Sequence, residues 1–351
     1  MKIGVFLPNW VGDVAMATPA LRALREHFGS GARLIGIMRP YVAEVLAGTS
    51  WLDEHVFYDL HSFRQRLVGW PLVRRLRALR LDTAILLPNS FRTAWMAWAG
   101  GANERIGYVR GGRGPLLTRK LAPAKIGGRF APTSAVDYFL ELVYAAGCPP
   151  ASRRLELATP ADDVRGAERV WAKFRFRPDR GVVVLNTGGA FGAAKLWPNG
   201  YFSALARRIA VEDRRGVLVI CGPNEREPAR EIVKGARHPQ VQSLADERLG
   251  LGLSKACVRR AALMVTTDSG PRHFAAAFDV PCITLFGPTH VGWSENYHCR
   301  AVHLQLELDC VPCQRRTCPL GHHRCMRDLS IDEVYRAVKA QLELQTHGQA
   351  A

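Results

Sequence analysis

The feature that most constrains the fold is a strand–turn–helix pattern that occurs in both halves of the chain. In the first half, the apolar run at 2–7 predicts a strand, and apolar residues at helical spacing predict a helix at 14–28. After a proline-bearing stretch at 148–163, the pattern begins again with a predicted strand at 182–185 and a helix at 200–210. Strands that alternate with helices are typical of βαβ units and a parallel sheet. The sequence therefore predicts an α/β chain.

The other predicted elements continue this alternation. The predicted strands are 34–38, 83–87, 217–221, 263–267 and 282–286, and the predicted helices are 63–79, 133–146, one that begins at 224, 271–278 and 330–345; 111–128 is predicted to be a long surface loop. A chain of 351 residues is long enough for two domains of ordinary size. We expect one doubly wound domain at 1–160, a second at 161–330, and a final helix and tail at 331–351.

Ligands of doubly wound domains bind beyond the carboxyl ends of the strands, and Asn9-Trp10-Val11-Gly12-Asp13 follows the first predicted strand. Gly12 is predicted to let the backbone turn tightly before the first helix. Asp13 could be the N-cap of that helix, since aspartate is favoured there. If it faces a cleft between the domains, it could instead accept the proton of an attacking hydroxyl. The local sequence leaves both roles open.

A second polar segment, 186–198 (NTGGAFGAAKLWP), follows the first predicted strand of the second half. Its glycines allow a phosphate to approach the backbone closely, and Lys195 supplies a positive charge. The segment matches neither the P-loop nor the dinucleotide GxGxxG pattern. It is predicted to contact a phosphate; an ordinary glycine-rich loop with a solvated lysine is the alternative.

A third polar segment, 266–273, ends a strand and begins a helix. Ser269 suits the N-cap of that helix, and Pro271 suits an early helical position. The N–H groups after Ser269 are predicted to bind an anion such as a diphosphate. His273 could donate to a phosphate oxygen, or it could be a structural hydrogen-bonding group. The turn at 286–289 follows another strand end and is predicted to line the same pocket.

Together these segments resemble glycosyltransferase family 9, the ADP-heptose-dependent heptosyltransferases. The resemblance covers nearly the whole chain and is carried by PNWVGDVAMATPALRALR, GGAFGAAKLWP and VTTDSGPRHFAAAFDVPCITLFGPT. It implies a GT-B architecture, in which two Rossmann-like domains face each other across a cleft, and an inverting mechanism that requires no metal. It implies transfer of a heptose from ADP-L-glycero-D-manno-heptose to the inner core of lipopolysaccharide. A family member with a different nucleotide sugar or acceptor is the alternative.

The resemblance also assigns roles to residues. Asp13 is implied as the general base and Lys195 as a catalytic contact to the donor phosphate. The implied donor-binding residues are Thr187, Gly188, Lys195, Glu225 (with Glu227 as the alternative acid), Asp268, Ser269, Gly270 and His273. The first domain is implied to bind the acceptor, and we assign this role to Asn9, Trp10, Gly12, Arg74 and Arg75. The sequence departs from the family at Pro271-Arg272, where relatives usually carry two apolar residues; this leaves the role of an additional cation open.

The chain is strongly basic, with 48 Lys and Arg against 31 Asp and Glu and a formal net charge of +17. Fourteen of these basic residues but only two acids lie within 62–129. Such a segment is either a solvated surface or a face that binds a polyanion. Given the resemblance, the predicted partner is an anionic glycolipid acceptor, and 63–80, with Trp70, could also contact anionic headgroups of the inner membrane, although Pro71 interrupts it.

A nucleic-acid-binding protein is the competing class of function. It would use the positive charge together with a cysteine knuckle near the end of the chain. The basic segment, however, lies far from those cysteines in the sequence, and the three polar segments would be left unexplained. The sequence therefore favours the enzyme.

Four closely spaced cysteines could form a structural zinc site: Cys310, Cys313, Cys318 and Cys325. Only the first pair has the spacing of a zinc knuckle, so reduced structural thiols are favoured and no metal is assigned. The sequence has no signal-peptide pattern and no apolar stretch near the roughly 18 residues of a membrane span. It predicts a cytoplasmic protein, at most peripheral to the inner membrane, with largely reduced cysteines.

Overall fold

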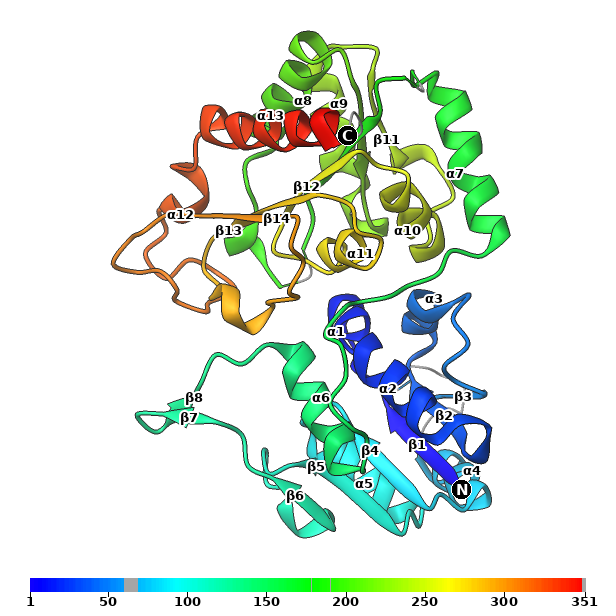
Figure 1. The fold of residues 1–351 in the computed structure, drawn as a ribbon. Helices are drawn as coiled ribbons and strands as arrows, with labels where there is room; N and C mark the ends of the chain where they lie inside the picture. Colours follow the sequence, from blue (N-terminus) through cyan, green and yellow to red (C-terminus); the bar gives the residue numbers. More distant parts are fainter. Residues whose placement is uncertain (60–68, 178, 190, 349–351) are drawn as a thin grey trace. The chain divides into compact units, whose positions relative to one another are not determined.

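The computed structural model describes residues 1–351 except 60–68, 178, 190 and 349–351. The chain divides into two compact units (Figure 1). The first unit comprises Met1–Ala158 together with Gly292–Tyr297, and the second comprises Thr159–Val291 together with His298–Ala351. Each unit is built on a six-stranded sheet of its own.

The sheet of the first unit has the strand order β3-β2-β1-β4-β5-β6. Its strands are β1 (Lys2–Phe6), β2 (Arg33–Met38), β3 (Glu54–Phe57), β4 (Thr83–Leu86), β5 (Glu104–Tyr108) and β6 (Arg119–Leu121), all paired in parallel. A short antiparallel pair follows, β7 (Lys125–Ile126) with β8 (Arg129–Phe130). This order is that of the dinucleotide-binding doubly wound fold, in which the direction of winding switches between the first and fourth strands.

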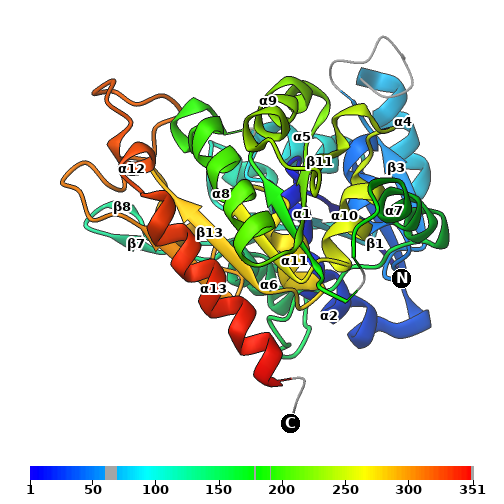
Figure 2. The ribbon, with the colours of Figure 1, turned by 90° about the horizontal axis from the view of Figure 1, so that it is seen from above.

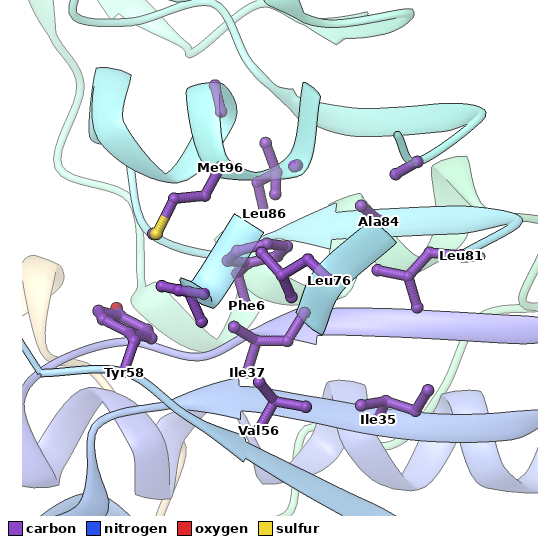
Figure 3. Close-up of a cluster of buried hydrophobic side chains, with 14 of the residues drawn as sticks. Phe6, Ile35, Ile37, Val56, Tyr58, Leu76, Leu81, Ala84, Leu86 and Met96 are labelled. Atoms are coloured by element: carbon purple, nitrogen blue, oxygen red, sulfur yellow. The ribbon is translucent and has the colours of Figure 1, made fainter. Parts of the chain in front are cut away.

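The helices of the first unit are α1 (Val11–Met16), α2 (Thr18–Phe28), α3 (Ala43–Leu46), α4 (Gly69–Leu79), α5 (Phe91–Ala99) and α6 (Ala135–Ala145). α4 and α5 lie over one face of the sheet, and a cluster of buried apolar side chains fills the interface (Figure 3). Phe6 and Ile37 enter it from the strands, Leu76 from α4 and Met96 from α5. Burial of this apolar surface holds the helix layer on the sheet and fixes the carboxyl end of β1.

The second unit repeats the same strand order, β11-β10-β9-β12-β13-β14, again with parallel neighbours. Its strands are β9 (Val182–Asn186), β10 (Gly216–Ile220), β11 (Val241–Ser243), β12 (Leu263–Thr267), β13 (Cys282–Phe286) and β14 (Ala301–Gln305). Its helices are α7 (Ala161–Phe174), α8 (Asn199–Glu212), α9 (Arg226–Ala236), α10 (Leu251–Arg259), α11 (Arg272–Ala277), α12 (Arg324–Arg327) and α13 (Ile331–Gly348).

The last helix, α13, packs beside α8 (Figure 2). An ion pair joins them, with Arg208 Nη1 2.5 Å from Asp332 Oδ1. The buried indole of Trp197, in the loop before α8, donates to the backbone oxygen of Leu329, 3.0 Å away. The final helix is therefore part of the second unit. Across the described part of the chain, we find no helix with the length and apolar character that crossing a bilayer requires.

Two parallel sheets of this order confirm the predicted α/β class. Three local predictions were wrong. The helix predicted at 14–28 is two helices, because α2 begins at Thr18 and Pro19 occupies its first turn, where proline is favoured over a helix interior. The predicted loop at 111–128 contains the edge strand β6. The helix predicted from 224 begins with a 3-10 turn, Pro223–Glu225, before α9. Part of the predicted helix 63–79 lies outside the described residues.

Candidate functional site

The polar segments after β9 and β12 come together at the winding switch of the second sheet, because these two strands are neighbours. The amide Nδ2 of Asn186 donates to Thr266 Oγ1 at 2.9 Å and to Ser269 Oγ at 2.7 Å. Thr267 Oγ1 donates to the backbone oxygen of Gly188 at 2.9 Å. These buried bonds fix the glycine-rich segment against the turn after β12, so a ligand bound there would meet a rigid backbone.

Ser269 does not cap a helix. The residue before α11 is Pro271, which provides no side-chain cap, and α11 is only six residues long. The hydroxyl of Ser269 is instead held by Asn186 on the neighbouring strand. The predicted N-cap was therefore wrong, because α11 begins only at Arg272 and the Ser269 hydroxyl bonds to Asn186 instead. The backbone oxygen of Gly270 accepts from the N–H of His273 at 3.1 Å, which closes the turn.

Lys195 and Asp268 form a buried ion pair at the centre of this turn. Lys195 Nζ lies 2.5 Å from Asp268 Oδ2 and 3.1 Å from the backbone oxygen of Asp268. Thr289, in the turn after β13, donates from Oγ1 to the same Oδ2 at 2.7 Å. The ammonium also lies 4.4 Å from the ring centroid of Phe191, a cation–π contact. Lys195 is thus not the solvated lysine of the alternative interpretation: both partners of the pair are only 7% exposed.

Arg272 supplies a second cation on the other side of Asp268. Its Nη1 lies 3.6 Å from Asp268 Oδ1, and its Nη2 lies 2.9 Å from Nε2 of His303. The guanidinium stands 5.0 Å from the ring centroid of Phe286, and the side chain is 1% exposed. The additional cation at the Pro271-Arg272 departure from the family is therefore a buried partner of Asp268.

These cations control the ionisation of the centre. Burial by itself raises the pKa of the Asp268 carboxyl, but Lys195, Arg272 and the hydrogen bond from Thr289 outweigh it and lower the pKa to about 2. Burial, together with the charge of Arg272, lowers the pKa of His273 well below its usual value. At neutral pH the centre therefore contains an ionised carboxylate, two cations and a neutral imidazole.

The two candidate acids near α9 differ in position. Glu225 accepts from the N–H of Gly222 at 2.7 Å, and its carboxylate lies against Gly188, where an added Cβ would meet Oε1 at 1.8 Å. Glu227 points elsewhere: its Oε2 accepts from Arg230 Nη1 at 3.2 Å on the exposed side of α9. Glu225 is therefore the acid that adjoins the glycine-rich segment. Thr187, next to Gly188, is buried.

An open cavity of about 750 Å³ lies at the carboxyl ends of β13 and β14. Its lining includes His290, Gln305, Glu307 and Asp309. It adjoins the charged centre, because Gln305 Nε2 donates to the backbone oxygen of Thr289 at 2.8 Å. A lining of this kind offers donors and acceptors to a hydroxyl-rich ligand.

In the first unit, the polar residues after β1 form a smaller cluster. Asn9 Oδ1 accepts from the hydroxyl of Tyr58 at 3.1 Å, and its backbone oxygen accepts from the hydroxyl of Tyr41. Trp10 is 49% exposed and is the N-cap residue of α1, so Asp13 is not the N-cap. Asp13 lies in the first turn of α1 and is half-buried.

Three other residues predicted in the first unit lie differently from expectation. Gly12 is the buried second residue of α1, so the tight turn predicted at this glycine is absent; the chain bends at Asn9 and Trp10 instead. Arg74 and Arg75 are exposed residues in the middle of α4, whose buried residues face the sheet. They lie on the outer face of the helix layer, and the structure does not bring them to the loop after β1.

The four cysteines near the end of the chain gather around one small pocket, which His322 also lines. All four are free thiols. Burial, with the neighbouring cysteines Cys310, Cys313 and Cys318, raises the pKa of Cys325 to about 11. Among the described residues, only Asp279, His298 and Cys299 form a group whose ligand atoms all lie within 4.8 Å of one another. The four sulfur atoms do not meet this distance criterion.

Sequence reasoning assigned no role to Asn186 or His303 and did not pair Arg272 with Asp268, whereas Thr289 belongs to the turn predicted to line the pocket. The short separation of Asp268 and Arg272 in the sequence was a weak signal, because the turn between β12 and α11 brings the two residues together. His303 gave no comparable signal, since it reaches Arg272 only through the pairing of β14 with β13.

The sequence of this chain is similar to known glycosyltransferases. The profile of the family described as "Glycosyltransferase family 9 (heptosyltransferase)" matches residues 70–324. Lipooligosaccharide heptosyltransferase 2 of Campylobacter jejuni is 26% identical over 358 residues, which cover 98% of this chain and 99% of the relative.

Two solved structures are similar over nearly their whole length. The Escherichia coli ADP-heptose LPS heptosyltransferase II has a TM-score of 0.79 and 24% identity and covers 99% of this chain and 100% of its own. The E. coli heptosyltransferase WaaC with ADP-2-deoxy-2-fluoro heptose has a TM-score of 0.69 and 18% identity, with 97% and 99% covered. These similarities confirm the predicted two-domain GT-B fold class.

Proposed function

Because the chain belongs to glycosyltransferase family 9, the heptosyltransferases, it is a glycosyltransferase, and we propose that it transfers a heptose from ADP-L-glycero-D-manno-heptose to the inner core of lipopolysaccharide. The similarity to heptosyltransferase 2 over nearly the full length supports the acceptor, and the WaaC complex with an ADP-heptose analogue supports the donor. The observation that carries the proposal is the buried centre of Lys195, Asp268 and Arg272, which suits a diphosphate.

The proposed role of this centre is to bind the donor diphosphate and to stabilise it as it leaves. Two cations and one carboxylate give the centre one excess positive charge. Lys195 is the cation that the glycine-rich segment itself supplies, and the N–H groups of Ser269 and Gly270 are the proposed backbone donors. His273, which is neutral, can donate one N–H without adding charge. A preorganised donor of this kind is worth roughly 2.7–4 kcal/mol in the transition state.

Arg272 is proposed as a positioning residue. Its guanidinium is already engaged by Oδ1 of Asp268 and Nε2 of His303, so we propose that it acts through Asp268, holding Oδ1 while Lys195 and Thr289 hold Oδ2. With the carboxylate fixed in this way, Lys195 is oriented without being fully neutralised. His303 accepts from Arg272 and so supports its orientation.

We propose that Thr187, Gly188 and Glu225 contact the nucleotide part of the donor. Glu225 lies against Gly188, and a carboxylate can accept from ribose hydroxyls. The contact of Glu227 with Arg230 on the outside of α9 supports Glu225 in preference to Glu227 for this role.

Asp13 is the proposed general base. The acceptor hydroxyl would give its proton to the Asp13 carboxylate as its oxygen bonds to the anomeric carbon. The bond from that carbon to the diphosphate breaks on the opposite side, ADP leaves, and the configuration inverts. Asn9, Trp10 and Gly12 are proposed to position the acceptor, and the exposed ring of Trp10 is suited to stack on a sugar.

The proposed chemistry requires no metal, because the charge on the leaving diphosphate is met by the cations of the protein. The four C-terminal cysteines are proposed to act as reduced structural thiols. Their loop supports the donor segment: the N–H of Ala194 donates to the backbone oxygen of Arg316 at 3.1 Å. Metal analysis of protein purified without a histidine tag tests this proposal, and one bound ion per chain would contradict it.

We further propose that the acceptor is an anionic glycolipid and that the enzyme works on the cytoplasmic side of the inner membrane, where nucleotide sugars are available. The excess of basic over acidic residues at 62–129 supports an anionic partner.

Donor competition tests the proposed function. ADP-heptose and ADP should compete for the same site, and GDP and UDP should bind at least tenfold more weakly. Equal or tighter binding of GDP or UDP would instead assign a different nucleotide sugar to this family member.

A further inference from the structure

The outer faces of α4 and α5 form one continuous surface of the first unit. The inner sides of both helices are buried in the core of Figure 3. The helices also touch each other: Arg77 Nε donates to the backbone oxygen of Ala99 at 2.7 Å, and a Cβ added to Gly100 would lie 2.8 Å from Leu76 Cβ. Their outer sides are therefore adjacent.

This surface exposes large aromatic side chains. Trp70 on α4 is 64% exposed, and Phe91 and Trp98 on α5 are each 53% exposed. Phe91 and Trp98 are seven residues apart, so they lie on the same side of α5. Trp95, between them, is partly buried. Gathered aromatic exposure of this kind is unusual on a surface that faces only water and indicates an interaction site.

The same surface is purely basic. Arg74, Arg75 and Arg77 on α4 and Arg92 on α5 are exposed, and neither helix contains an aspartate or a glutamate. No ion pair among the described residues involves these four arginines, and Arg75 and Arg77 donate to backbone oxygens, of His55 and Ala99. The charge is therefore not neutralised within the described part of the unit.

We propose that this α4–α5 surface docks the enzyme on a bilayer that contains anionic phospholipid. Indole and phenyl rings partition into the interface between headgroups and acyl chains, and arginines pair with headgroup phosphates. The combination of exposed aromatic rings and arginines favours an anionic bilayer as the partner. A basic helix that only faces water has no need of exposed aromatic side chains. The inference deepens the proposed function, because a lipid-linked acceptor lies in such a bilayer. It also gives Arg74 and Arg75 lipid phosphates as partners in place of the acceptor sugar.

Vesicle co-sedimentation of the full chain tests the proposal without any substrate. We expect binding to vesicles of phosphatidylcholine with phosphatidylglycerol, little binding to phosphatidylcholine alone, and a decrease as salt rises. Two variants should each reduce partitioning at least tenfold: Trp70→Ser with Phe91→Ser and Trp98→Ser, and Arg74→Glu with Arg75→Glu.

The matched control is Arg177→Glu with Arg336→Glu, which makes the same charge change at exposed positions of the second unit. It should retain binding close to that of the unchanged protein. Melting curves establish that each variant is folded. The proposed docking surface is contradicted if the wild-type protein does not bind anionic vesicles. It is also contradicted if the control variant loses as much binding as the α4–α5 variants.

Two further results would also overturn it. Tighter binding to duplex DNA than to vesicles at equal salt would assign the surface to nucleic acid. A dimer that the aromatic variant dissociates would assign it to a second copy of the chain. The aromatic variant should transfer sugar normally to a deacylated, water-soluble acceptor. Vesicle binding without sugar transfer by the wild-type protein would contradict the proposed function and leave the docking surface standing.

Discussion

The two sheets of this protein share one strand order, yet the residues after their first strands differ in kind. After β9, Lys195 forms a buried pair with Asp268, which follows the neighbouring strand β12, and each is only 7% exposed. After β1, Trp10 is 49% exposed and Asp13 is half-buried. The same backbone frame thus supports a dense, fixed set of charges in one unit and an open polar loop in the other.

The difference agrees with the two proposed tasks. A diphosphate carries the same charges in every turnover, so a preorganised set of cations stabilises it without reorganisation. An acceptor hydroxyl must approach from solvent and give up one proton, which requires an accessible carboxylate. The following changes test this division, from the largest expected effect to the smallest.

Replacing the proposed base should have the largest effect. Asp13→Asn should lower kcat roughly 10²–10⁴-fold, because the amide cannot accept the hydroxyl proton. ADP affinity, measured by calorimetry, should not change, since the nucleotide is proposed to bind in the other unit. Glu26→Gln, the same kind of change on α2, is the control. Near-normal transfer by Asp13→Asn would remove the base assignment.

Lys195→Met should lower kcat roughly 10²–10³-fold, since it removes the cation proposed to meet the leaving diphosphate. It should also weaken ADP binding and lower the melting temperature, because Asp268 loses a buried partner. Lys234→Met, at an exposed lysine of α9, should leave all three quantities unchanged. Normal ADP affinity in folded Lys195→Met protein would contradict the donor role.

Arg272→Leu should lower kcat about tenfold, a smaller loss than at Lys195, because Arg272 acts through Asp268. Arg272→Lys should restore part of the activity by returning a charge. If Arg272→Leu and Lys195→Met proved equally damaging at equal stability, Arg272 would have to contact the donor directly.

The pH dependence separates this positioning role from a purely structural one. The pKa of Asp268 is lowered to about 2 from its usual 3.8, so the native-state stabilisation is fully present above pH 4 and is lost as the pH falls toward 2. Without Arg272 this pKa should rise, and the acid loss of both stability and activity should move to higher pH. An unchanged acid limb in both measurements would speak against a coupling between Arg272 and Asp268.

The smallest expected effect distinguishes the two acids near α9. Glu225→Gln should raise the KM for the donor severalfold with little change in kcat, because it removes an acceptor for the nucleotide. Glu227→Gln should behave like the wild-type enzyme, since that side chain is exposed and faces Arg230. The reverse order would move the nucleotide contact to α9.

Much of the fold could be predicted from the sequence because parallel strands covered on both faces read as unbroken apolar runs. β9 and β12 are fully buried runs of this kind, and both were predicted within one residue. The edge strand β6 has the sequence Arg-Lys-Leu and is largely exposed, so it gave no apolar signal. Such a strand forms because β5 offers its free edge to it.

The candidate site could be predicted in outline but not in its contacts. The segments that hold Lys195 and Asp268 were identified because each follows a strand. That the two residues form an ion pair was not predictable, since 73 residues separate them and only the neighbouring positions of β9 and β12 bring them together. Glu225 and Glu227 were equivalent in sequence, and the 3-10 turn before α9 distinguishes them.

The most direct test of the proposed function is the mass of the product after incubation with ADP-heptose and a truncated lipopolysaccharide acceptor. The account predicts that one heptose residue is added, that one ADP is released per transfer, and that the new bond has the inverted anomeric configuration by NMR. ADP release without a glycosylated product would contradict the proposed function. So would retention of configuration, or rapid transfer from another nucleotide sugar when ADP-heptose gives no reaction.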